Sequence, residues 1–192
     1  MPWHWMSVRT VLTVVVAIMV AWSAPAFAQD IPPAKIAIVE MQRIQNEASA
    51  WKDLSQKLKA AQEKVLQELA PQQTALEEEA KALQQQQAIL APEAFEGKVA
   101  EFEQKRREMV QQSNERRQAV ERALVDSKNL IISAIRDILV GITEEKGYNL
   151  ILDQSNADPT IVVASPDINI TDTVIKRLNE KLPTVEFSVP AQ

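Results

Sequence analysis

The chain contains no cysteine, one histidine and three glycines in 192 residues. Without cysteine it forms no disulfide and has no thiol nucleophile or thiolate metal ligand. The glycines, at positions 97, 141 and 147, are too widely spaced for the phosphate-binding loop of a Walker or Rossmann motif. These absences argue against thiol enzymes and against enzymes that use a glycine loop to bind nucleotides.

The first 28 residues resemble an export signal. One cation, Arg9, precedes an apolar run from Val11 to Trp22, and the small-residue sequence A-F-A ends at Ala28. This is the pattern of a secretory signal peptide. A retained membrane anchor is the alternative, but the run is shorter than the roughly 20 apolar residues of a spanning helix. We predict cleavage after Ala28 and export to the periplasm.

Cleavage would remove the histidine, His4, and with it any histidine-based zinc site or Ser-His-Asp triad. It would leave 20 basic residues against 26 acidic ones, a net charge of about −6, so the general basic field of a nucleic-acid-binding protein is absent. We therefore predict no enzymatic activity, no cofactor, no metal site and no nucleic-acid partner.

A long helical segment occupies residues 42–146. Helix-forming residues fill it, with apolar side chains recurring at steps of three and four, and only two prolines and two glycines interrupt it. Pro92 disfavours helix at Ala91 and suits the first turn of a new helix, so the pattern predicts an antiparallel coiled-coil hairpin with its turn near 91–92. In that register Trp51 lies opposite Ile131 or Ile132. Each arm would reach roughly 70 Å.

Pro71 lies in the middle of the outgoing helix, opposite a polar stretch bracketed by two arginine pairs. A proline inside a helix removes one hydrogen bond and kinks the helix, so we predict a hinge at Pro71. The arginine pairs at 106–107 and 116–117 either flank the helix in solvent, paired with Glu103 and Glu121, or make weak contact with anionic lipid or client carboxylates.

The two ends of the chain, residues 29–41 and 147–192, predict a small β-rich body. Strands are expected at 35–39, 149–152 and 161–164, followed by a helix with Thr171 as its N-cap. About 60 residues make a marginal core, and oligomerisation is a common remedy. The predicted fold class is α+β, a long helical hairpin extending from a small body.

Two stretches at the ends carry a resemblance to a known family. "KIAIVEMQRI" near the start and "GYNLILDQSN" with "IVVASPDINITDTVIKRLNE" near the end resemble the Skp/OmpH periplasmic chaperones. The resemblance implies a homotrimer whose three hairpins enclose unfolded outer-membrane proteins without ATP. Familiar members are strongly basic, whereas this chain has a pI near 5.1, so a lipopolysaccharide site is not carried over.

One alternative to the chaperone function remains open. A structural spacer or tether of the cell envelope is the alternative function, but no lipobox cysteine marks an attachment point.

Asp153 ends a predicted strand without a second acid or histidine nearby, so we interpret it as a strand-ending or capping residue. The trimer-core candidates are Ile36, Ile38, Leu150, Leu152 and Val162, and the client-binding candidates, near the tip of the hairpin, are Leu83, Leu90, Phe95, Phe102 and Met109.

Overall fold

The computed structural model describes residues 32–155, 161 and 163–190. The predicted signal peptide and Val162 lie outside these residues. From Ala34 onward the chain forms one compact unit. Its elements are β1 (Ile36–Val39), α2 (Met41–Glu47), α3 (Ser49–Gln86), α4 (Pro92–Lys146), β2 (Leu150–Asp153), the 3₁₀ helix η1 (Pro166–Ile168) and α5 (Thr171–Lys181).

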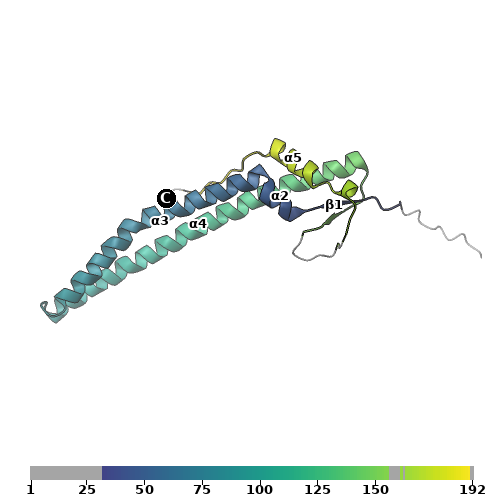
Figure 1. Ribbon diagram of the computed structural model, residues 1–192. Helices are drawn as coiled ribbons and strands as arrows, with labels where there is room; N and C mark the ends of the chain where they lie inside the picture. The colour runs from purple at the N-terminus through teal and green to yellow at the C-terminus, as the bar shows by residue number, and fades with distance from the viewer. Residues whose placement is uncertain (1–31, 156–160, 162, 191–192) are drawn as a thin grey trace, which may run out of the picture. The chain divides into compact units, whose positions relative to one another are not determined.

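The two long helices, α3 and α4, run side by side and are joined at their far end (Figure 1). Two ion pairs connect them, Glu79 to Lys105 at 2.8 Å and Glu68 to Arg116 at 3.4 Å. The earlier residue of α3, Glu68, pairs with the later residue of α4, Arg116, so the helices are antiparallel.

The connection between the long helices begins earlier than predicted. α4 starts at Pro92, after an extended Ala91, as the proline indicates. α3, however, ends at Gln86 and not at Leu90. The amides of Ile89 and Leu90 both turn back to the carbonyl of Gln86, at 3.0 Å each, and this turn replaces the last predicted turn of helix.

A break at Ala48 separates α2 from α3, where the sequence predicted one helix. Ala48 is extended, with ψ of 141°. The amide and hydroxyl of Ser49 both donate to Oδ1 of Asn179 in α5, at 2.8 and 2.9 Å. Asn179 therefore supplies the N-terminal cap of α3 from more than a hundred residues away.

The small sheet is parallel. Ile36 pairs with Leu150 and Val39 with Asp153, so the whole helical hairpin is the crossover between β1 and β2. The third predicted strand is wrong at its described residues, 161, 163 and 164, none of which is in a strand. On the other edge of β1, Ile38 instead forms a bridge with Asn169, and the Ile170 amide donates to the Ile38 carbonyl at 2.9 Å.

The predicted N-cap of the last helix is wrong by one residue. Ile170 occupies that position, and Thr171 is the first helical residue. The Thr171 amide donates to Oδ1 of Asn169 at 2.9 Å, while its hydroxyl accepts from the Glu40 amide at 3.0 Å. Thr171 is fully buried, so its hydroxyl links the start of α5 to the end of β1.

The hydrophobic core lies where the hairpin meets the sheet and α5. It therefore extends across the predicted boundaries between body and hairpin. The buried residues of the core are Ala37, Val39, Ile44, Ala48, Ala50, Leu54, Ile131, Ala134, Ile135, Ile138, Ile142, Ile170, Val174, Leu178 and Val185.

Within the described ranges, no helix is long and apolar enough to cross a membrane.

Candidate functional site: the distal arm of the hairpin

The outer part of the hairpin, residues 55–118, contains no buried side chain, although all of these residues are described. We call it the distal arm. Burial ends at Leu54 on α3 and resumes only at Ala119 on α4. Beyond Glu68 and Arg116 the two helices have no third layer among the described residues. Their seam stays partly open to water there, so the apolar side chains of the distal arm are shared between the seam and solvent.

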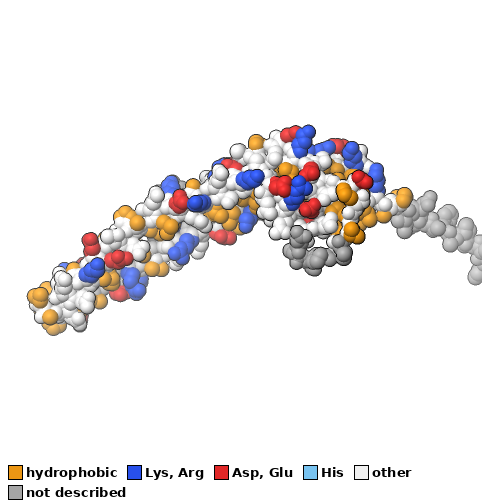
Figure 2. Space-filling model, in the orientation of Figure 1, with side chains coloured by type: hydrophobic (Ala, Val, Ile, Leu, Met, Phe, Trp, Pro, Cys, Tyr) orange, Lys and Arg blue, Asp and Glu red, His pale blue; other side chains and the backbone are white. Residues whose placement is uncertain are grey.

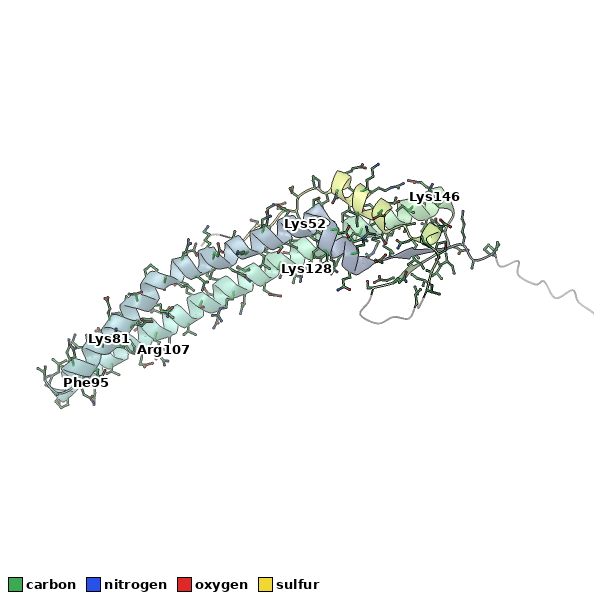
Figure 3. The ribbon with its side chains drawn as sticks, in the orientation of Figure 1. Lys52, Lys81, Phe95, Arg107, Lys128 and Lys146 are labelled. Carbon is green, nitrogen blue, oxygen red and sulfur yellow. The ribbon has the colours of Figure 1, made fainter. Side chains whose placement is uncertain are left out.

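The five predicted client-binding residues are all half-buried in this arm. Phe95 lies close to the turn, near the tip (Figure 3). Met109 lines a shallow depression between the helices together with Leu76 and Lys105. None of the five is buried in a core, and none is fully exposed.

Three large apolar side chains that the sequence did not single out are more exposed. Ile89 is 81% exposed, Leu66 70% and Val110 49%. Each directly follows or precedes a seam residue in sequence, so it continues the apolar stripe onto the surface. Figure 2 shows the hydrophobic side chains gathered at the tip and in patches along the arm. The sequence contains one sign of these exposed residues: at each of the three places two apolar residues stand side by side, where the seam needs only one.

Charged side chains decorate the same arm. The ammonium of Lys105 hydrogen-bonds Glu79, which raises the pKa of Lys105. Arg106 pairs with Glu103 at 2.7 Å, as predicted, whereas Arg116 pairs across the hairpin with Glu68. Arg106 of the first pair thus has a partner on its own helix, and Arg116 of the second pair helps to hold the helices together.

Pro71 lies inside α3, which continues through it. Because proline has no amide hydrogen, the carbonyl four residues earlier, that of Gln67, lacks its helical donor. The hydroxyl of Thr74 donates to the Ala70 carbonyl at 3.0 Å. Pro71 lies between the two ion pairs that tie the helices, in a stretch without buried neighbours.

The sheet brings four of the five trimer-core candidates together on one face. Ile36 pairs with Leu150 and Ile38 with Leu152. Alternate residues of a strand point to opposite faces, and Ala37 and Val39 belong to the helical core, so the four candidates face away from it. Ile38 is buried, Ile36 and Leu152 are half-buried, and Leu150 is 44% exposed.

Asp153 has the structural role that the sequence indicated. It is the last residue of β2. Its Oδ1 accepts from the amide of Met41, the first residue of α2, at 3.1 Å, and from the amide and hydroxyl of Ser155 at 3.0 and 2.6 Å. Three donors at one carboxylate oxygen end the strand and cap the helix.

Trp51 lies at the base of the hairpin, the end next to the sheet. Trp51 packs half-buried against the core that includes Ile131, which is fully buried, whereas Ile132 is 43% exposed.

The helix α4 ends at Gly147, which has a positive φ of 69° that glycine adopts without strain. The Gly147 amide donates to the Thr143 carbonyl at 2.8 Å. Lys52 and Lys128 lie near the base of the hairpin, while Lys81 and Arg107 lie on the distal arm (Figure 3).

No curated protein matches the chain. A crystal structure at 2.83 Å of a candidate outer membrane chaperone (OmpH-like) from Caulobacter crescentus CB15 matches with a TM-score of 0.72 and 22% identity, over 84% of this chain and 94% of that chain. At this identity the likeness shows the fold alone. The family described as outer membrane protein (OmpH-like) matches residues 35–178. Since that match covers most of the chain, the protein belongs to the OmpH-like family.

Proposed function

We propose that the protein is a periplasmic chaperone that holds unfolded outer-membrane β-barrel proteins without ATP and prevents their aggregation before membrane insertion. Membership of the OmpH-like family supports this function. The observation that carries it is the distal arm, a long surface of half-buried and exposed apolar side chains with no core beneath it.

The chemistry of such a surface fits a client that must be released unchanged. Each half-buried side chain has only part of its area left to bury, so each contact contributes little. Many contacts along two long helices add up over a large area. Lys and Arg side chains between the apolar residues keep the surface soluble and provide hydrogen-bond donors for an unfolded backbone.

The apolar sheet face supports a homotrimer as the working state. Ile36, Leu150 and Leu152 lie together on the sheet face opposite the helical core, where Ile38 is buried, Ile36 and Leu152 are half-buried and Leu150 is 44% exposed. An exposed apolar face of this kind favours association with further copies. In a trimer the three hairpins would extend from one body, and the clients would lie between them. The acidic balance of the chain leaves anionic lipid, at most, a weak contact through the arginine pairs.

A shortened hairpin tests this function. Gln72 and Gln112 line the same depression between α3 and α4, so deleting residues 72–112 and joining the ends with a short turn removes both helices in register. The core at the base is untouched by this cut. The shortened protein should still assemble, but it should no longer suppress the aggregation of an outer-membrane protein diluted out of urea.

Point variants give the matched comparison. Ile89→Ser and Val110→Ser remove exposed apolar groups, whereas Gln87→Ser changes an exposed polar position of the same turn region. The two apolar replacements should weaken protection, and the polar one should leave it unchanged. A spacer or tether of the cell envelope would not protect the client in any form. Full protection by the shortened hairpin would show that the arm is not the binding surface.

A further inference from the structure

The segment after α5, residues 183–190, has an arrangement that neither the fold nor the proposed function requires. We call it the strap. Figure 1 shows the chain leaving α5 and running back beside α3. The strap has no regular secondary structure of its own beyond a short bend. It nevertheless makes hydrogen bonds to both long helices.

The bonds that hold the strap go to its backbone. At Val185 the amide donates to Oδ2 of Asp53 at 2.9 Å, and the carbonyl accepts from Nζ of Lys57 at 2.7 Å. At Glu186 the carbonyl accepts from the hydroxyl of Ser127 at 2.7 Å. None of these bonds uses a strap side chain, so they would form equally with the backbone of another extended segment.

Asp53 and Lys57 form a ready-made acceptor and donor for one residue of a peptide. They lie one helical turn apart on α3 and are bridged to each other at 2.8 Å. The hydrogen bond from Lys57, and after it the bond from the Val185 amide, lowers the pKa of Asp53. The carboxylate therefore remains ionised and accepting at neutral pH, beside a cation that donates to the carbonyl of the same residue.

The side chains of the strap alternate. Val185 is 1% exposed and belongs to the core, and Phe187 and Val189 are half-buried. Thr184, Glu186 and Ser188 are exposed. A period of two is the pattern of an extended chain with one apolar face, and it is also the pattern of the strands of outer-membrane barrels, which alternate between lipid and lumen.

The site continues along the inner part of the distal arm. Val189 and Pro190 line a small cavity with Ala61 and Glu68. Nη1 of Arg116 donates to the Pro190 carbonyl at 3.3 Å. Its Nε is buried and has no hydrogen-bond partner among the described residues, so one donor at this end of the strap is left for a further acceptor.

We propose that this surface of α3 and α4 is a binding site for extended polypeptide with apolar side chains at alternate positions, and that the strap is its resident ligand. A client segment of the same pattern takes the site by displacing the strap, which links client binding to release of the C-terminal segment. The identity of this competitor rests on the proposed function. The site itself rests only on the bonds and burial of the strap.

A single label follows the strap. Because the chain has no cysteine, Ser188→Cys offers one exposed thiol for a fluorophore, and Lys52→Cys offers a matched site on the body of α3. The Ser188→Cys label should show restricted rotation in the protein alone and become mobile when an unfolded outer-membrane protein is added. The Lys52→Cys label should not respond.

Aggregation of the same client, measured in parallel, separates the two proposals. Protection of the client without any change at the Ser188→Cys label would overturn client displacement of the strap and leave the chaperone function standing. Absence of protection would count against the proposed function, and the site would then be decided by peptide binding alone.

Peptide binding uses the strap's own sequence. Val185→Asp places a charge where a buried valine packs, so the strap should leave the site, while Val189→Asp is a milder companion if the first variant loses its helical circular dichroism. The emptied site should bind a labelled peptide PTVEFSVP. The intact protein should bind it at least about tenfold more weakly, because its tethered strap competes at high effective concentration.

A second peptide tests the pattern. PVVFESTP has the same composition with its apolar residues in one block, so an extended chain cannot place them all on one face. It should bind the emptied site at least several-fold more weakly. Equal binding of the two peptides, or binding of neither to a strap-displaced protein that remains helical, would refute the proposed site.

Discussion

Replacing Val185 by alanine tests whether the strap is part of the core. The substitution removes two methyl groups from a side chain that is 1% exposed. At about 0.8 kcal/mol for each buried carbon group, the lost transfer free energy is about 1.6 kcal/mol. The cavity left in the core adds to this, so we expect the free energy of unfolding to fall by about 2–3 kcal/mol.

The matched control is Val163→Ala, which makes the same chemical change at a side chain that is 85% exposed. It should alter the free energy of unfolding by less than about 0.5 kcal/mol. Unfolding in urea is followed by the fluorescence of Trp51, which is the one tryptophan left after the predicted cleavage at Ala28. Protein concentration is held constant because an oligomer's stability depends on it. Equal losses for the two variants would show that the strap does not pack as described.

The remaining predictions concern the hinge, the assembly and the effect of acid. Pro71→Ala restores a backbone donor and should stabilise a straight α3 by up to about 3 kcal/mol; X-ray scattering should show stiffer arms, and an unchanged profile and client range would exclude a hinge. Ile38→Asp places an unpaired charge at a buried position of the sheet, so folding and trimer assembly should be lost together; a trimer mass by light scattering would contradict this. The pKa of Asp53 lies below its ordinary 3.8 in the folded protein, so its stabilising effect is complete above about pH 5 and is lost as the pH falls through the lower folded value. In the protein without client, the label at position 188 should therefore gain mobility in acid, and high mobility of that label at neutral pH without client would contradict the role of Asp53.

The features that the sequence predicted well are those with a local cause. Pro92 starts α4 because its ring fixes φ and its missing amide is not needed there. Gly147 ends α4 because only glycine adopts the required positive φ without strain. β1 and β2 lie within one residue of their predicted bounds because short apolar runs with β-branched residues favour extended chain.

The sequence predicted apolar side chains along the hairpin seam, but it did not predict which side chains are most exposed. Spacing by three and four residues identifies a seam, but it does not say how deeply the seam is buried. That depth depends on whether a third layer covers the helices. α5 covers the base, and the strap reaches only as far as Glu68 and Arg116, in the inner part of the distal arm. Leu66, Ile89 and Val110 were missed for this reason, since a pattern on one helix carries no information about what lies opposite it.

By itself the sequence determined the long helices, their proline and glycine ends, the short strands and the membership of a family. Only the tertiary structure decided the break at Ala48, the start of α5 and the course of the strap. In each case the deciding hydrogen bond joins residues more than a hundred positions apart, Ser49 with Asn179, Glu40 with Thr171, and Asp53 with Val185. Local propensity governs a backbone group that bonds within its own turn. A group that bonds to a distant side chain takes its conformation from the fold, and no pattern of neighbouring residues records that partner.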